Sequence, residues 1–341
     1  MGLARYGGVS VRSFVLLVNG VISGQARHAD GACRACKPIR GPILKSPPDS
    51  PHFMDARFAL FVVSLAVGLV IYSEPLRRLI SLSLESHTHS YIVAMPFIAL
   101  FALAWNRKEI FHKVGYSYAA GSIWIFLSLA LHVWCRMTEW NANADEGLVL
   151  STLSAVGFIT GTLVFFYGVN TFRNALTPVL FLVLMVPLPA PVLDALTAFL
   201  QRGSLDAAYW IFRTAGIPVS LDGFVLMLPF IDLEVAPECS GIRSTMALFI
   251  VSLLIGTVYL KSAAGRVVLL LSSVAISIFK NGMRIVFLYV ITANFGESVL
   301  AGPWHTRGGN LFFVVALLLL SPVAWGLRAL ERRRRFASSC K

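Results

Sequence analysis

The chain has 341 residues, of which 57% are hydrophobic and 13% are charged, and its formal net charge is +12. A soluble domain would carry about a quarter charged residues, so the composition excludes a soluble globular protein and predicts a polytopic membrane protein. The basic residues occupy short segments between apolar runs and a run at 332–335. No aromatic-basic motif accompanies them, so we expect topology determinants and no nucleic-acid partner.

The first 53 residues differ from the rest of the chain. They are rich in Gly, Pro, Arg and Lys, and their one apolar patch, 14–22, is shorter than the roughly 20 residues that a spanning helix needs. The residues flanking this patch have a weak signal-peptide character. The interpretation that we favour makes 1–53 a disordered or artefactual extension before a start at Met54. We then expect a transmembrane domain over 54–330 and a basic cytoplasmic tail over 331–341.

Eight apolar runs follow, each near the length of a tilted spanning helix. The predicted fold class is therefore an all-α polytopic integral membrane protein with about eight transmembrane helices. The runs are 56–73, 90–105, 117–135, 147–169, 174–190, 241–260, 267–290 and 308–327. The charged segment 191–238 predicts interfacial helices around 192–215, a turn at 216–218 and a short extended piece before the cysteine at 239.

The distribution of basic residues predicts the orientation. With the N-terminus inside, 20 of the 29 Lys and Arg residues lie inside and 9 outside; without the first 53 residues the counts are 13 and 9. This excess favours both ends in the cytoplasm. Cys239 then lies at the outer end of the sixth run. Arg284 lies 18 residues after Arg266, about 27 Å along the seventh run and near the same interface, and His305 follows in an outer connector.

Cysteine, arginine and histidine at one membrane face indicate a thiol acyl-transfer site. A helix N-terminus and the nearby Arg243 favour the thiolate of Cys239, which would attack a carbonyl. His305 would transfer the proton, and Arg284 would stabilise the oxyanion or bind substrate. Spacing alone leaves inert interpretations open, because a lone cysteine is usually a small apolar residue and an arginine can reach the headgroups.

Neither the other cysteines nor the other histidines predict a cofactor. The five cysteines, at 33, 36, 135, 239 and 340, are too few and too scattered for a disulfide framework. The C-x-x-C pair at 33 and 36 has no second pair, and the H-x-H pair at 87 and 89 has no further ligand nearby in the sequence. We expect no metal and no organic cofactor.

Several motifs occur in a characteristic order along the chain. They are HTHSY at 87–91, MVPLP at 185–189, GIP at 216–218 with DG at 222–223, ECSGIRS at 238–244, NGMR at 281–284 and HTRGG at 305–309. Together they resemble the exosortase/archaeosortase family over roughly residues 86–327. Two departures occur: Pro237-Glu238 stands where that family more often has Glu-Ala, and Ser90 replaces the glycine expected after His89.

The resemblance implies a membrane-embedded cysteine protease or transpeptidase that processes PEP-CTERM-like C-terminal sorting signals. Cys239 would be the nucleophile, His305 the general acid/base and Arg284 the transition-state or substrate partner. Supporting roles would fall to five further residues, Glu238, Ser240, Arg243, Asn281 and His89. The implied location is the inner membrane, crossed several times, with the active site on the periplasmic side.

The expected partners are the lipid bilayer and the C-terminal transmembrane segments of exported proteins, with a link to exopolysaccharide or surface-protein export. Two other classes of function stay open. A non-catalytic assembly factor for exopolysaccharide secretion would not need Cys239. A small transporter would usually carry internal repeats, and the sequence has none that we detect. The acceptor nucleophile and the oligomeric state are left open.

Overall fold

The computed structural model describes residues 51–86, 88–112, 114–138, 144–296 and 303–339; for Glu238 and His305 the description is limited to the backbone. The chain divides into two units, Met1–Asp49 and Ser50–Lys341, and the first lies outside the described residues. The predicted extension 1–53 therefore falls almost entirely outside them and stays a prediction.

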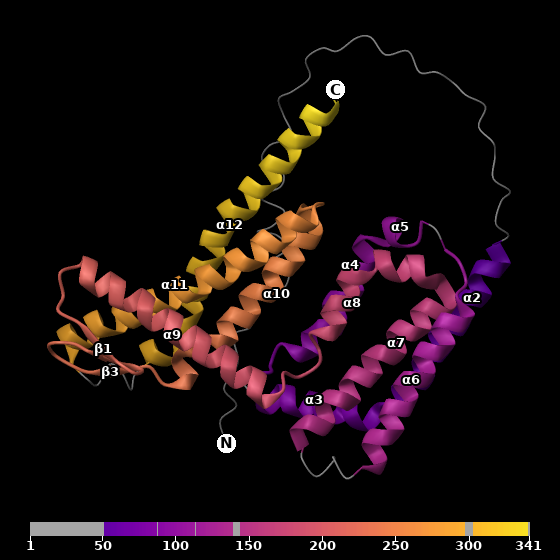
Figure 1. Ribbon diagram of the computed structural model, residues 1–341, viewed down its shortest axis with the longest axis horizontal. Helices are drawn as coiled ribbons and strands as arrows, with labels where there is room; N and C mark the ends of the chain where they lie inside the picture. The colour runs from indigo at the N-terminus through magenta and orange to yellow at the C-terminus, as the bar shows by residue number, and fades with distance from the viewer. Residues whose placement is uncertain (1–50, 87, 113, 139–143, 297–302, 340–341) are drawn as a thin grey trace, which may run out of the picture. The chain divides into compact units, whose positions relative to one another are not determined.

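Helices dominate the described chain (Figure 1). The α-helices are α2 (Pro51–Ile71), α3 (Ser73–Glu85), α4 (Met95–Trp105), α5 (Arg107–Ile110), α6 (Tyr118–Met137), α7 (Ala144–Asn174), α8 (Leu176–Val183), α9 (Ala190–Thr214), α10 (Ile242–Tyr259), α11 (Ala263–Phe295) and α12 (Pro303–Ser339). Two 3-10 helices, η1 (Ile92–Ala94) and η2 (Pro237–Ser240), and three strands, β1 (Ser220–Asp222), β2 (Val225–Met227) and β3 (Leu233–Glu234), complete the described elements.

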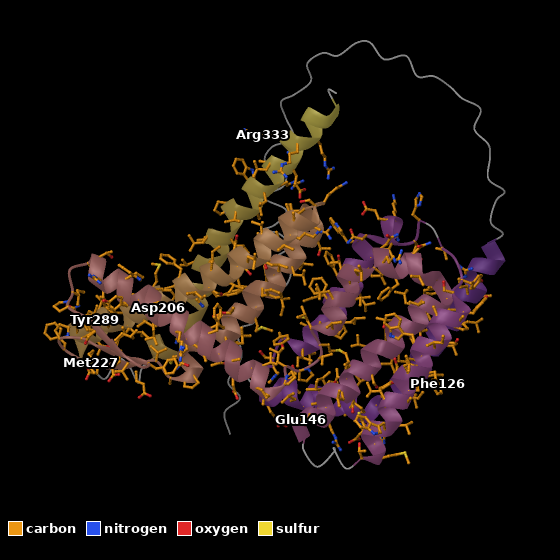
Figure 2. All side chains as sticks on the ribbon, viewed as in Figure 1. Phe126, Glu146, Asp206, Met227, Tyr289 and Arg333 are labelled. Carbon is orange, nitrogen blue, oxygen red and sulfur yellow. The ribbon has the colours of Figure 1, made fainter. Side chains whose placement is uncertain are left out.

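Within the described residues, five helices are long and apolar enough to cross a membrane. They are α6, most of α7, α10, α11 and the part of α12 from 311 to 335; α2 and α3 add a sixth if they are counted as one bent span. Large apolar side chains such as Phe126, 69% exposed on α6, cover the outside of these helices (Figure 2). The structure confirms a helical, polytopic membrane protein, but the described residues do not confirm the predicted count of about eight spans.

Two of the predicted runs are too short in the structure to cross a bilayer. α4 has 11 residues, which give about 16 Å of helix, and α8 has only 8. α8 ends shortly before Pro187 and Pro189, which lack the backbone N–H and disfavour a helical conformation in the residues before them. α4 and α8 instead pack together and bury Ala102 and Phe181 in the core.

The first predicted run ends in a bend. α2 and α3 meet at 71° around Tyr72, because Pro75 cannot donate the backbone hydrogen bond that would continue α2. Tyr72 is buried at the bend, whereas Arg77 and Arg78 on α3 are exposed and pair with Glu74. α3 thus has one charged face and one buried face, as an interfacial helix does.

The segment before the cysteine combines one helix with a small sheet. α9 covers the predicted interfacial region and is not among the candidate spans. The three strands form an antiparallel sheet in the order β1-β2-β3, in which Ser220 pairs with Met227 and Leu226 with Leu233. This small sheet stands where the sequence analysis predicted a single extended piece. Leu226 is fully buried against the side chains of α9 and α11, so the sheet belongs to the bundle.

α11 is the helix around which the site is built, since it contacts α9, α10 and α12. It packs tightly against α9 at Gly282. A Cβ atom added there would lie 2.7 Å from Ala207 Cβ and 3.1 Å from the backbone nitrogen of Ala208. Any side chain at position 282 would push the two helices apart. The neighbouring positions on α11 are therefore held at a fixed depth against α9.

Candidate active site

Cys239 lies in a tight turn just before α10. Its backbone N–H donates to the Ala236 carbonyl at 2.8 Å within η2, and α10 begins three residues later at Ile242. Between them Gly241 adopts the left-handed conformation, with φ of +76°, which glycine tolerates without strain. The structure confirms that Cys239 precedes a helix that is long and apolar enough to cross a membrane. The half-buried thiol lies next to the helix end whose first N–H groups favour a negative charge.

Asn281 joins this turn to the two neighbouring helices. Its side-chain amide donates to the Cys239 carbonyl and to Ser204 Oγ on α9, both at 3.0 Å. The residue is 1% exposed, and a Cβ atom at Gly241 would lie 2.9 Å from Asn281 Oδ1. A side chain at either position 241 or position 282 would therefore disturb this arrangement. Asn281, which the sequence placed in a supporting role, fixes the backbone of Cys239 to α11.

We expect Asn281→Ala to destabilise the protein. The change removes the two hydrogen bonds that the Asn281 amide donates to the Cys239 carbonyl and to Ser204 Oγ. Leaving a buried polar group without its partner costs about 1–3 kcal/mol of unfolding free energy. Asn294→Ala is the matched control, because exposed Asn294 lies on the same helix and donates to the Val290 carbonyl of its own helix. Thermal denaturation of the purified, detergent-solubilised protein measures the difference. Equal effects of the two changes would contradict the positioning role.

α11 also brings two cations to the cysteine turn. Arg284, half-buried, lies one helical turn after Asn281. Lys280, 3% exposed, donates from Nζ to Ser244 Oγ, which in turn donates to the Gly241 carbonyl at 2.9 Å. The predicted common level of Cys239 and Arg284 stays a prediction, to which the contact of Asn281 with the Cys239 carbonyl adds the helix that carries both Asn281 and Arg284. The sequence analysis missed Lys280, although a lysine inside an apolar run is itself a signal of function.

His305 lies in the first turn of α12. Phe312, seven residues further along, contacts Phe287 on α11 with ring centroids 5.5 Å apart. Since Phe287 is one turn from Arg284, α12 runs beside the site, with His305 about 10 Å beyond Phe312 along the helix axis. The structure thus joins Asn281 to the Cys239 turn, places Arg284 one turn further along α11 and places His305 on the adjoining helix α12.

The remaining supporting residues are distributed around and beyond the turn. Ser240 is buried, Arg243 is exposed in the first turn of α10, and Glu238 belongs to η2. His89 lies between α3 and η1, where its Nδ1 is 3.1 Å from Ser86 Oγ. The His89 carbonyl also accepts from the Ile92 N–H at 3.0 Å, so His89 is held in a hydrogen-bonded turn, and its supporting role stays a prediction. Burial raises the pKa of Tyr91, two residues further along, to about 12, so its phenol stays protonated at neutral pH.

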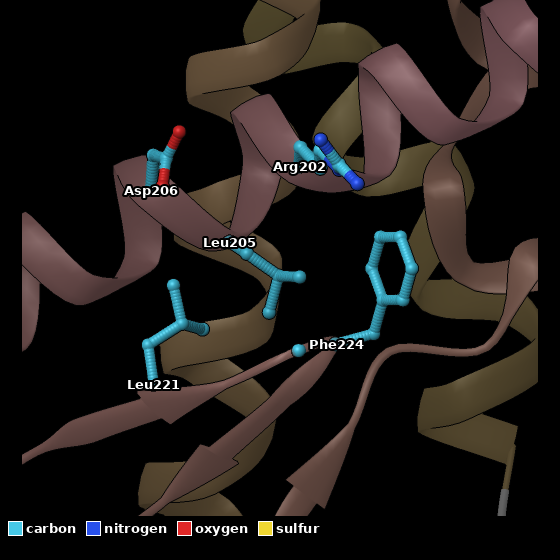
Figure 3. A pocket seen from close by; sticks show the side chains of 6 residues that line it. Arg202, Leu205, Asp206, Leu221 and Phe224 are labelled. Carbon is cyan, nitrogen blue, oxygen red and sulfur yellow. The ribbon is translucent and has the colours of Figure 1, made fainter.

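A cleft of about 310 Å³ lies between α9 and the β1–β2 hairpin (Figure 3). The guanidinium of Arg202 lies 5.7 Å from the centre of the Phe224 ring, and Leu205 and Leu221 supply apolar walls. Gln201, the residue before Arg202 on α9, donates to the Val235 carbonyl, two residues before η2. The cleft is therefore built on the same helix and strands that lead to Cys239. The sequence analysis named Asp222-Gly223 as a motif but did not predict the cleft.

The described residues contain no group of three His, Cys, Asp or Glu side chains that would hold a metal ion. The expectation of no metal and no cofactor stays a prediction.

Comparison with protein families gives one match that covers most of the chain. Residues 83–321 match the family described as Transmembrane exosortase (Exosortase_EpsH). The chain belongs to the transmembrane exosortase family. This range contains Cys239, Arg284 and His305, and it confirms the resemblance predicted over roughly 86–327. Searches of curated proteins and of solved structures gave no match.

Proposed function

We propose that this exosortase-family protein is a membrane cysteine protease or transpeptidase that cleaves C-terminal sorting signals of exported proteins. The observation that carries the proposal is the Asn281 bridge, which ties the Cys239 backbone to the helix that bears Arg284. A nucleophilic thiol and a permanent cation at one level of a membrane bundle suit attack on a peptide carbonyl. A non-catalytic assembly factor would not need this arrangement.

In the proposed reaction, the Cys239 thiolate attacks the scissile carbonyl and forms a C–S bond. Arg284 stabilises the negative charge on the carbonyl oxygen. The tetrahedral intermediate then expels the C-terminal fragment as an amine, and His305 supplies the proton to its nitrogen. A second nucleophile, water or an amine, attacks the thioester, His305 takes up the proton that this nucleophile loses, and Cys239 leaves as the thiolate. The cycle begins with transfer of the thiol proton of Cys239 to His305, which later gives that proton to the leaving amine.

The charge distribution supports a site on the periplasmic side of the inner membrane. α10 has 18 residues and runs from the Cys239 turn to Tyr259, a distance of about 27 Å. Basic residues gather where α10 ends, at Lys261, Arg266 and along the end of α12. Since cytoplasmic segments carry the excess of Lys and Arg, the opposite end, with Cys239, would face the periplasm. There a substrate helix that leaves the bilayer would present its peptide to the thiol.

A reporter tests this function. An exported protein with a C-terminal motif, transmembrane helix and basic cluster should lose that signal when co-expressed with the chain. A reporter with a scrambled motif but the same helix is the control. Immunoblotting of both reporters measures conversion. Signal processing would be contradicted if a reporter that carries a C-terminal signal encoded in the same genome as the chain stayed uncleaved. Equal cleavage of the scrambled control would contradict it as well.

A further inference from the structure

A strongly basic cleft lies at the end of the bundle away from Cys239. It has a volume of about 460 Å³ and lies between the α4–α5 junction, the α10–α11 turn and the end of α12. Seven of its lining residues are basic and two are acidic, an excess of five positive charges. The residues that carry most of this charge are Arg107, Lys108, Lys261, Arg328, Arg332 and Arg335.

Glu331, one of the two acidic residues that line the cleft, is already engaged with the backbone. The carboxylate of Glu331 accepts hydrogen bonds from the N–H groups of Lys261 and Ser262, both at 3.0 Å, and from Ser262 Oγ. It thereby closes the α10–α11 turn and brings the end of α12 against it. Glu331 orders the wall of the cleft, and its oxygens are occupied by these donors.

Two arginines of the cleft are held in place. Arg266 donates to the Leu260 carbonyl at 3.0 and 3.1 Å and reaches Thr177 Oγ1 at 3.4 Å. The guanidinium of Arg328 lies 4.9 Å from the centre of the Tyr259 ring. Neither forms an ion pair within the part of the chain that the structure describes. The cleft is therefore a preformed concave site with a surplus of positive charge.

The level of the cleft matches that of lipid headgroups. The 18 residues of α10 separate it from the Cys239 turn by about 27 Å, close to the roughly 30 Å of a bilayer hydrocarbon core. Trp105, 58% exposed, and Tyr259 line it, and both residue types concentrate at the membrane interface. A ligand in this cleft would be bound next to the bilayer surface.

We propose that this cleft binds the phosphate headgroup of an anionic phospholipid. Guanidinium groups match phosphate oxygens in geometry and charge, and basic pockets between transmembrane helices suit such headgroups. The bound lipid would join the α4–α5 junction to the ends of α10 and α12. This site is distinct from the Cys239 turn, and the proposal is independent of the thiol chemistry.

The run of arginines on α12 provides a matched pair of variants. Arg332 and Arg335 line the cleft together with Arg328 and Glu331, with spacings of three and four residues that place them on one helix face. Arg333 and Arg334 belong to the same run but do not line the cleft. Figure 2 shows Arg333 near the C-terminal end of α12. Replacing either pair removes the same charge from the same helix.

The test titrates delipidated, full-length protein in detergent with phosphatidylglycerol and measures the dissociation constant by native mass spectrometry. Each arginine near an anionic lipid contributes about fivefold to the affinity, so R332Q/R335Q should weaken binding about 25-fold. R333Q/R334Q should bind nearly as the wild type does, and R332K/R335K should retain much of the affinity. Phosphatidylcholine should bind far more weakly.

Three results would overturn the proposal. Equal weakening by the two glutamine pairs would show an effect of net charge alone. Equal binding of phosphatidylcholine and phosphatidylglycerol would show that the anionic headgroup is not recognised. Displacement of the lipid by inorganic phosphate at the same concentration would assign the cleft to a free phosphate compound.

Discussion

Replacing Cys239 by alanine is expected to abolish cleavage of the sorting-signal reporter. Without the thiol no thioester can form, and loss of a catalytic nucleophile costs about 10⁴-fold or more in rate. Cys239→Ser should also be inactive, because a serine hydroxyl in this turn lacks the acidity of a thiol. The readout is the ratio of full-length to shortened reporter after co-expression, followed by immunoblotting.

Cys135→Ala is the matched control for this change. Cys135 is 1% exposed within α6, a helix that is not part of the Cys239 turn. Its replacement should leave cleavage near the wild-type level. Shortened reporter in cells that carry only Cys239→Ala would exclude the thiol mechanism, provided that the variant is present in the membrane at the wild-type amount.

Replacing Arg284 by alanine is expected to lower kcat/KM by about 10²- to 10³-fold, the usual cost of losing one group that stabilises an oxyanion. The structural reason is its place on α11, one turn from the residue that binds the Cys239 carbonyl. Arg284→Lys keeps the charge but loses the planar fork, so we expect only partial activity. Time courses of cleavage with purified enzyme and substrate measure both variants.

The control for Arg284 is Arg213→Ala. Arg213 is an exposed arginine in the last turn of α9, with its guanidinium 5.7 Å from the Trp210 ring centre, and it should leave the rate unchanged. If Arg284→Ala retains wild-type kcat/KM, the assigned role is wrong. If both arginine variants lose activity equally, the effect is one of general charge or folding.

Much of the bundle could be predicted because apolar run length and proline position are local signals. The runs that became α6, α7, α10 and α11 were long, and they formed helices. Length alone failed for 90–105 and 174–190, where short helices pack against each other and leave no continuous span. The sheet was missed because its strands are two or three residues long and gain their burial from α9 and α11.

Part of the site could be predicted because helix rise, like run length, follows from the local sequence. Helix rise predicted Arg284 near the level of Cys239, and in the structure Asn281, three residues before Arg284 on α11, donates to the Cys239 carbonyl. The pairing of Asn281 with Ser204 could not be read from the sequence, because it depends on the close approach of α9 and α11 at Gly282. Lys280 could have been found from its cost within an apolar run. The roles of the site residues in catalysis stay predictions.

The most direct test is the mass of the covalent intermediate on the enzyme. Purified protein would be mixed with a substrate peptide, quenched in acid and digested, and the peptide that contains Cys239 would be analysed by mass spectrometry. We predict that this peptide gains the mass of the substrate's N-terminal fragment through a thioester that hydroxylamine removes. Cleaved substrate with an unmodified Cys239 peptide at every time point, and continued cleavage by Cys239→Ala, would contradict the account.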